Sequence, residues 1–181
     1  MPDLQPPGTI FVLGGARSGK SAFAESLARK AELERHYIAT ARAFDDEMRA
    51  RIARHKETRG TGWTTQDCPL CLTDALRATL SPDRIVLVDC LTLWVTNLMM
   101  EEVGDKAIDA AFGDLVSIVA EPAGPLILVS NEVGLGIVPE NSMARAFRDH
   151  AGRLHQQIAA SAADVHFVAA GLSMKLKGMN R

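Results

Sequence analysis

Cysteine and aromatic residues are scarce in this sequence, with three cysteines and 5% aromatic residues among 181 positions. Cys68 and Cys71 stand as Cys-Pro-Leu-Cys, but a zinc site would require a second pair or histidines at ligand spacing. A thioredoxin-like dithiol would follow a strand and open a helix, and that context is not clear here. We therefore interpret the cysteines as free thiols of a reducing compartment, with a functional dithiol as the less favoured alternative.

An excess of charge of one sign and long apolar runs are also lacking. The net charge of -2 gives no field that would attract a polyanion, so nucleic acid is not an obvious partner. The most apolar stretch, residues 85–100, is interrupted by Asp89 and Asn97 and is too short for a membrane span. Residues 1–8 have neither the basic region nor the apolar region of a signal peptide, and we expect a flexible leader and a cytoplasmic protein.

Short apolar runs alternate with longer helical patterns along the rest of the chain. Runs that are apolar on both faces indicate strands covered on both sides, as in a parallel sheet with helical crossovers. We expect strands at Thr9–Leu13, His36–Thr40, Arg84–Asp89, Pro125–Ser130 and Asp164–Ala170, with a further edge strand at Trp63–Asp67. The expected helices are Lys20–Leu33, Asp45–Thr58, Leu70–Leu80, Leu91–Glu102, Lys106–Ala120 and Ser142–Ala162. The sequence therefore predicts one α/β domain over residues 9–181.

A phosphate-binding motif follows the first expected strand. Gly14 and Gly19 bracket four residues and precede Lys20 and Ser21, which is the P-loop spacing G-x-x-x-x-G-K-[ST]. The glycines let backbone N–H groups point at phosphate oxygens, Lys20 brings a cation to the β and γ phosphates, and the Ser21 hydroxyl ligates magnesium. Because a strand precedes the motif and a helix follows it, a simple connecting turn is the weaker alternative.

Asp89 ends a buried expected strand and can provide the carboxylate that such a loop needs for its magnesium. The alternative is that Asp89 caps the helix that follows it, since Asp is a favoured N-cap residue. The guanine-reading sequence N-K-x-D of GTPases does not occur in the chain, and the D-x-x-G match at residues 149–152 lies inside a helical pattern. A GTPase switch is therefore disfavoured.

A charged helix is expected over Asp45–Thr58, and its role is open from residue types alone. Arg51, His55 and Arg59 recur four residues apart and tend towards one side of the helix. A solvated surface helix is the simpler interpretation. An imidazole can also attack a phosphorus atom to form a phosphoramidate, and Lys56 and Arg59 are placed to stabilise the charge that develops.

Several segments together resemble one enzyme family. They are GGARSGKS, YIATA, DDEMRARIARHKETR with a following Trp, VDCLTLWVTNLM, SNEVGLGIVPENSMARAFRDHAGRLHQ and GLSMKLK. Their order is similar to that in the bifunctional adenosylcobinamide kinase / adenosylcobinamide-phosphate guanylyltransferase of cobalamin biosynthesis, over Thr9 to Lys177. The P-loop is generic, whereas the NEVGxGIVPEN stretch and the histidine helix are specific to the family.

The resemblance implies a P-loop NTPase fold of the RecA-like kind and two reactions. A nucleoside triphosphate, ATP or GTP, phosphorylates adenosylcobinamide, and GTP then gives GMP to adenosylcobinamide phosphate through a guanylylated histidine, which would be His55. It also implies Mg²⁺ held by Ser21 and Asp89, a homotrimer, and catalysis by His55 and Lys20. The implied nucleotide contacts are Gly14, Gly15, Ala16, Arg17, Ser18, Gly19, Lys20, Ser21, Thr40, Ala41, Lys56, Glu57, Thr58, Arg59, Asp67 and Asp89. Asp67 and Asp89 stand where some relatives have glutamate, which leaves open whether each contacts base, ribose or magnesium.

The stretch Asn131–Asn141 follows an expected strand and leaves the edge of the sheet where α/β folds bind ligands. It either contributes to the corrinoid or partner-subunit surface or only connects the strand to the next helix, which Asn141 or Ser142 could cap. The four histidines other than His55 are interpreted as structural, and Trp63 as packing rather than base stacking. A single-activity small-molecule kinase and a non-catalytic nucleotide-gated module remain the alternative functions.

Overall fold

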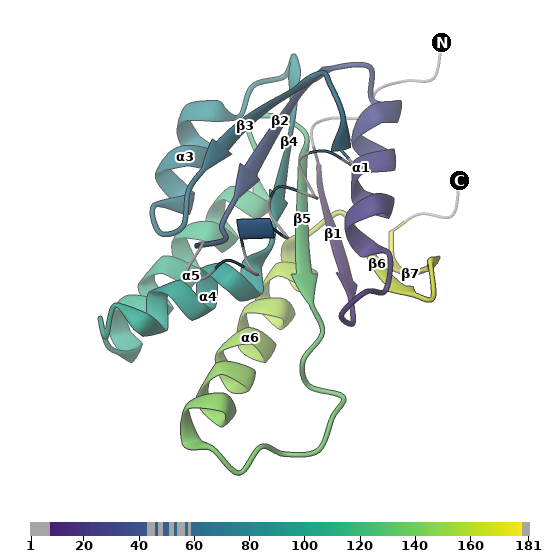
Figure 1. Cartoon of the computed structure of the whole chain (residues 1–181). Coiled ribbons are helices and arrows are strands. Elements are labelled where there is room, and N and C mark those ends of the chain that lie inside the picture. Colours follow the sequence, from purple (N-terminus) through teal and green to yellow (C-terminus); the bar gives the residue numbers. More distant parts are fainter. Residues whose placement is uncertain are drawn as a thin grey trace.

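A seven-stranded sheet forms the centre of the protein (Figure 1). The computed structural model describes residues 8–42, 46, 49, 50, 53, 57 and 59–178. Within these residues the strand order is β3-β2-β4-β5-β1-β6-β7, and every pairing is parallel except that of β6 with β7. The strands are β1 Thr9–Gly14, β2 Glu34–Ala39, β3 Trp63–Asp67, β4 Arg84–Asp89, β5 Leu126–Asn131, β6 Asp164–Ala169 and β7 Leu172–Lys177.

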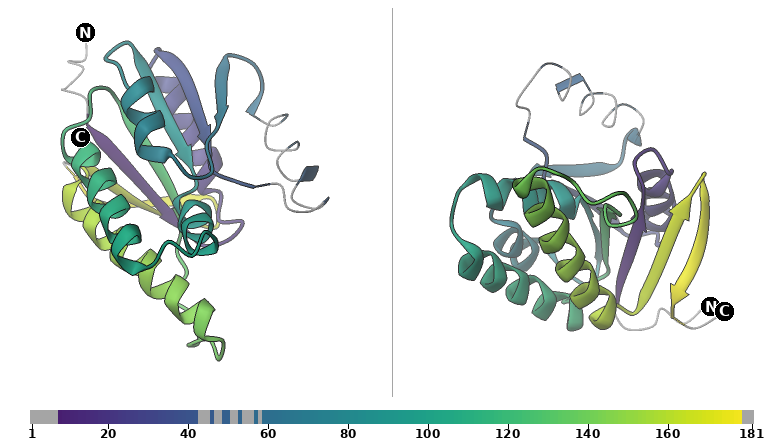
Figure 2. Two further views of the ribbon diagram at one scale, coloured as in Figure 1. Left: turned by 90° about the vertical axis from the view of Figure 1, so that its left-hand side faces the viewer. Right: turned by 90° about the horizontal axis from the view of Figure 1, so that it is seen from below.

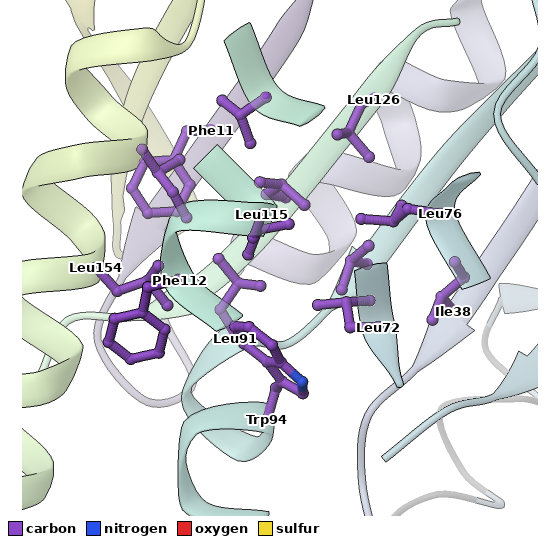
Figure 3. Close-up of a cluster of buried hydrophobic side chains, with 14 of the residues drawn as sticks. Phe11, Ile38, Leu72, Leu76, Leu91, Trp94, Phe112, Leu115, Leu126 and Leu154 are labelled. Atoms are coloured by element: carbon purple, nitrogen blue, oxygen red, sulfur yellow. The ribbon is translucent and has the colours of Figure 1, made fainter. Parts of the chain in front are cut away.

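Helices cover both faces of this sheet (Figure 2). On one face α1 packs against alternate residues of the strands, among them Val12, Leu87 and Val129. On the other face four helices enclose the larger core, in which Trp94 and Phe112 are fully buried with their ring centroids 5.9 Å apart (Figure 3). The helices are α1 Lys20–Lys30, α3 Leu72–Thr79, α4 Leu91–Met100, α5 Asp105–Ala120 and α6 Ser142–Ser161. The protein therefore has the P-loop NTPase fold, a mostly parallel sheet between two helical layers.

The expected elements are present with small shifts at their ends. Trp63–Asp67 is the edge strand β3, as predicted. The helix expected at Lys20–Leu33 ends at Lys30, because Ala31 closes it and the next residues enter β2. The described positions within Asp45–Thr58, namely 46, 49, 50, 53 and 57, are helical, as is Arg59. No helix among the described residues is long and apolar enough to cross a membrane.

One strand was missing from the sequence prediction. Residues Leu172–Lys177 form β7, which pairs antiparallel with β6 at the edge of the sheet. Ala170 and Gly171 connect the two strands, and both have positive φ, 50° and 77°. Two consecutive residues with positive φ are typical of the tightest β-hairpin turn. The expected strand Asp164–Ala170 therefore ends at Ala169, and the chain reverses.

Candidate functional site

The P-loop connects β1 to α1 at the carboxyl edge of the sheet. Gly19 has a φ of 92°, which favours glycine, and α1 begins at the next residue. The Lys20 side chain is buried and its Nζ donates to the carbonyl oxygen of Gly15 at 3.2 Å. This contact holds the ammonium group inside the loop, where phosphate oxygens would lie. Ala16 and Arg17 are exposed on the outside of the loop, and Ser21 is half-buried at the start of the helix.

The β6–β7 hairpin contacts the P-loop and fixes its shape. A Cβ atom on Gly14 would collide with the carbonyl oxygen of Val168, so only glycine fits at this position. The N–H of Gly171 donates to the carbonyl oxygen of Ser18 at 2.8 Å. A Cβ on Gly19 would stand 3.1 Å from the Cα of Gly171, a tight approach. The shape of the loop thus depends on residues about 150 positions further along the chain.

Asp67 and Asp89 end neighbouring strands at the carboxyl edge of the sheet, at the same register. Ala39 pairs with Asp67 on one side and with Asp89 on the other, so the ends of β3, β2 and β4 coincide. Because residues directly opposite each other project to the same face, both acids share the face covered by α1, the helix that follows the P-loop. β5 separates the strand of Asp89 from the strand of the P-loop. The two predicted acids and the P-loop therefore lie at the same edge of the sheet.

Asp89 accepts a hydrogen bond rather than capping the helix after it. The hydroxyl of Tyr37 donates to Oδ2 of Asp89 at 3.1 Å, whereas α4 has Cys90 at its N-cap position and no side-chain cap. Burial, and then the charge of Asp89, raise the pKa of Tyr37 above its ordinary value. The phenol therefore stays protonated and remains a donor. The sequence analysis did not identify Tyr37. Tyr37 lies two residues before Ala39 at the end of β2, so its side chain projects to the same face of the sheet as Asp67 and Asp89.

Arg59 ends the histidine helix with a buried guanidinium group. Its Cζ atom lies 3.5 Å from the ring centroid of Tyr37, and Nη2 donates to Oγ1 of Thr65 at 3.0 Å. The carbonyl oxygen of Arg59 accepts from Arg29 of α1 at 3.0 Å. These contacts fix the end of the helix against β2, β3 and α1. A contact of Arg59 with nucleotide stays a prediction, because in this arrangement the guanidinium already contacts protein groups.

The turn after β2 is held by buried hydrogen bonds. Oγ1 of Thr40 donates to the carbonyl oxygen of Cys90 at 2.7 Å and accepts from the N–H of Cys90 at 2.9 Å. The Asn97 amide donates to the carbonyl oxygen of Thr40 at 2.7 Å. Thr40 is fully buried, while Ala41 is half-buried. The side chain of Thr40 thus joins the ends of β2 and β4, and its contact with nucleotide stays a prediction.

Asn131 ends β5 between the P-loop strand and the strand of Asp89. Its amide donates to Oγ1 of Thr92 at 2.9 Å, and Thr92 lies 3.1 Å from Sγ of Cys90. Burial, and then the charge of Asp89, raise the pKa of the Cys90 thiol to about 11, and the hydrogen bond with Thr92 partly opposes this shift. Asn131, Thr92 and Cys90 therefore form one cluster at the ends of β4 and β5. The sequence analysis did not assign Asn131 a role in this site; its place at the end of a strand beside the P-loop strand could have identified it.

The preceding residue, Ser130, faces the other side of the sheet. Its Oγ lies 2.7 Å from Nε2 of His155 on α6, and both side chains are buried. Burial lowers the pKa of His155 to about 4. The described histidines have structural partners or surroundings: His150 lies 3.3 Å from Asp105, His36 lies 3.8 Å from Glu34, and His166 packs on Phe23.

The oxygen ligands of the site suit a magnesium ion. Ser21 and Asp89 offer hydroxyl and carboxylate oxygens, which are the donors that Mg²⁺ prefers, and Asp89 is kept on the α1 face by Tyr37. Among the described residues, no group of three or more His, Cys, Asp or Glu side chains could hold a metal by itself. Cys68 is buried, Cys71 is exposed, and both thiols are free.

Three predicted site residues, His55, Lys56 and Thr58, lie outside the described residues. Glu57 is helical and exposed. The described part of the site therefore comprises the P-loop, the three strand ends and Arg59. Asp67, at the end of β3, is exposed at the rim.

The sequence is similar to known proteins over most of its length. The model of the family described as cobinamide kinase / cobinamide phosphate guanyltransferase matches residues 10–176. The bifunctional adenosylcobalamin biosynthesis protein CobP of Pseudomonas aeruginosa is 48% identical over 168 residues, covering 93% of this chain and 96% of the relative. The protein CobU of Salmonella typhimurium, with the same description, is 43% identical over 180 residues, covering 93% and 99%.

Solved structures with low identity share the fold. The flagellar accessory protein FlaH of Methanocaldococcus jannaschii has a TM-score of 0.52 at 14% identity, over 94% of this chain and 78% of its own. A prototypical ATPase from the type III secretion system of pathogenic bacteria has a TM-score of 0.53 at 10% identity, over 93% and 56%. These likenesses concern the architecture of the sheet and helices.

Proposed function

The chain belongs to the cobinamide kinase / cobinamide phosphate guanyltransferase family, and from this premise we propose how one P-loop site carries out both reactions. It is a bifunctional enzyme of cobalamin biosynthesis, an adenosylcobinamide kinase and adenosylcobinamide-phosphate guanylyltransferase. The observation that carries the mechanism is that the Lys20 ammonium, held inside the P-loop, shares the carboxyl edge with Asp89 and with the end of the histidine helix at Arg59.

In the kinase reaction the hydroxyl oxygen of the aminopropanol arm attacks the γ phosphorus of ATP or GTP. The new oxygen–phosphorus bond forms as the bond to the β-phosphate oxygen breaks, the hydroxyl proton leaves to solvent, and the nucleoside diphosphate is released. Lys20 stabilises the charge on the transferred group, and the P-loop N–H groups hold the phosphates in line. Ser21 and Asp89 would hold Mg²⁺, which neutralises phosphate charge when bound.

In the guanylyl transfer a neutral imidazole nitrogen of His55 attacks the α phosphorus of GTP. A nitrogen–phosphorus bond forms and pyrophosphate leaves. A phosphate oxygen of adenosylcobinamide phosphate then attacks the same phosphorus, the nitrogen–phosphorus bond breaks, and adenosylcobinamide-GDP is formed. The buried contacts of Arg59 with Tyr37 and Thr65 support this step, because they hold Arg59, four residues after His55 in the sequence, close to the Tyr37 that binds Asp89.

Finer features accompany this proposal. The nucleotide contacts outside the P-loop are those predicted from the sequence, with Asp67 directed to base or ribose. The enzyme acts in the cytoplasm as a homotrimer, with adenosylcobinamide and its phosphate as partners and neither nucleic acid nor membrane involved. One catalytic domain spans residues 9–181.

Labelling with GTP tests the proposal against a kinase that never forms a covalent intermediate. GTP labelled at the α phosphate should give a protein adduct that survives alkali and is lost in acid. His55→Ala should abolish the adduct and GMP transfer, yet still phosphorylate adenosylcobinamide, because Lys20, Ser21 and Asp89 remain. His36→Ala, on β2 beside Glu34, is the matched control and should label normally.

Acidification gives a second arm of this test. Labelling of the normal protein should fall as pH drops below the histidine pKa, about 6.5 for an unperturbed side chain, because only the neutral imidazole attacks phosphorus. Labelling of His55→Ala at the normal rate would mean that another residue is the nucleophile.

A further inference from the structure

Arg148 carries a buried guanidinium nitrogen without a partner. The residue lies on α6 and is only partly exposed, and its Nη1 atom is fully buried with no hydrogen-bond acceptor among the described residues. No described carboxylate forms an ion pair with it either. Leaving a charged donor buried and unpaired is costly, so a buried arginine normally meets an anion.

Other arginines of the same helix do have partners. Arg145 donates to the carbonyl oxygens of Pro139 and Glu140, and Arg153 lies 3.2 Å from Asp109 on the outer surface. The lack of a partner for Nη1 is therefore specific to Arg148 and is not shared by Arg145 and Arg153 of the same helix.

The helix period places Arg148 beside the edge of the sheet that carries the P-loop. His155, on the same stripe of α6, contacts Ser130 at the end of β5. Arg148 is seven residues earlier, which is two turns and roughly 10 Å further along the helix, so it faces the same way but lies beyond the strand end. In Figure 1 this part of α6 extends past the ends of β1 and β5.

A groove between α4 and α6 adjoins this position. It is lined by Thr96, Met99, Met100, Asn141, Met143, Ala144 and Phe147, and its lining is mostly apolar. Arg148 follows Phe147 and is one turn from Ala144, on the side towards the sheet. Thr96 is one turn from Thr92, which accepts from Asn131 at the end of β5. Arg148 thus lies along α6 between Phe147, which lines the groove, and His155, which contacts the end of β5.

We propose that Arg148 binds a phosphoryl group of a substrate at this edge of the sheet. The inference rests on the proposed function, in which both substrates of the second reaction carry phosphate. A guanidinium presents a planar fork of donors that matches phosphate oxygens, and a phosphate would supply the anion that the described protein does not. The group is either the terminal phosphate of the nucleotide or the phosphate on adenosylcobinamide phosphate.

Binding measurements on Arg148→Met show whether the phosphate is that of the nucleotide or that of adenosylcobinamide phosphate. Met keeps much of the apolar stem and removes the charge. If Arg148 holds the terminal phosphate, the variant should bind GTP about 10-fold or more weakly and GMP normally. If it holds the corrinoid phosphate, GTP binding is unchanged, and affinity for adenosylcobinamide phosphate falls by a similar factor while affinity for adenosylcobinamide does not. Arg148→Lys should fall between Met and wild type in either case, and Arg153→Gln should match wild type.

Thermal unfolding without ligand separates this role from a structural one. Removing an unpaired buried charge should leave the Tm of the ligand-free protein equal or raise it, whereas removing a structural arginine lowers it. The proposal is overturned if Arg148→Met is folded and binds all four ligands as wild type does. A change in subunit association at unchanged ligand affinity would also overturn it, since the arginine would then pair with another copy. Turnover of the wild-type protein with GTP and adenosylcobinamide, measured alongside, reports on the proposed function separately.

Discussion

Lys20 is the side chain on which the proposed kinase reaction most directly depends. Its ammonium already lies inside the P-loop, hydrogen-bonded to Gly15, so phosphate binding requires no long movement of the charge. Lys20→Ala should therefore lower the kinase rate by about 100-fold or more while leaving the fold intact. Lys30→Ala, at the exposed end of α1, is the control and should retain full activity. Near-normal phosphorylation by a folded Lys20→Ala protein would refute the role of the P-loop.

Tyr37 orients Asp89, and its removal should change the magnesium requirement. Tyr37→Phe keeps the ring under Arg59 and deletes only the donor to Oδ2 of Asp89. Loss of a group that orients a metal ligand typically weakens metal affinity by about 10-fold or more. The magnesium concentration for half-maximal activity should rise in both reactions, as it should more strongly for Asp89→Asn. A lower Tm at an unchanged magnesium requirement would instead show that Tyr37 only packs.

His155 should make stability depend on pH on the acid side. Its folded pKa of about 4 lies below the ordinary value of 6.5, because burial disfavours the charged ring. Below pH 6.5 the unfolded chain binds a proton that the folded protein does not, so stability is lost as pH falls towards 4. The total is at most about 3 kcal/mol. His155→Gln, which can still contact Ser130, should flatten this part of the curve in urea unfolding between pH 7 and pH 4, and an identical slope would contradict the assignment.

At the scale of elements, the β6–β7 turn contains a residue whose backbone conformation lowers the stability of the protein. Ala170 has a φ of 50°, a left-handed conformation that costs a residue with a Cβ about 1 kcal/mol or more, and that Asn adopts more readily. Ala170→Asn should therefore raise the free energy of unfolding by up to about 1 kcal/mol. Ala169→Asn, in β6 just before the turn, should give no gain. A destabilised Ala170→Asn protein would mean that the new side chain disturbs the neighbouring P-loop.

Most helices and strands could be predicted because their own residues, without distant partners, show the apolar pattern of that element. The buried strands read as continuous apolar runs since both faces are covered, and Asn141 was a proposed cap of α6, where its side chain does accept from the N–H of Ala144. β7 was missed because its alternation of Leu, Met and Leu with Ser and Lys is short, and because its turn uses Ala where Asn is more usual. Its strand conformation depends on hydrogen bonds with β6, and a short window of sequence carries no signal of that pairing.

The site was predictable to the extent that a motif or a strand end marked it. The P-loop and Asp89 follow from spacing and a strand end, Asp67 was implied by the family resemblance, and the structure brings all three to one edge. Tyr37, Asn131 and Arg148 could not be found in this way, because their roles depend on which strands are neighbours and on what lies across from them. Strand order results from the packing of the whole sheet and has no local signal.

At the scale of the whole molecule, the sheet order joins distant parts of the chain at one edge. β5 stands between the strand of the P-loop and the strand of Asp89. Its last two residues contact two different helices, Ser130 contacting His155 of α6 and Asn131 contacting Thr92 at the start of α4. The two helical segments that border the proposed phosphoryl site are thus tied to consecutive residues of one strand.

The support that Val168 and Gly171 give to the P-loop has a consequence for the order of events during synthesis. The loop leaves the ribosome about 150 residues before the strand and turn that fix its shape. A nascent chain that ends within α6 should therefore carry the complete P-loop sequence and still fail to retain GTP. Chains stalled at successive lengths should acquire nucleotide binding only after the β6–β7 hairpin has emerged, so that the nascent enzyme is silent until that hairpin has formed.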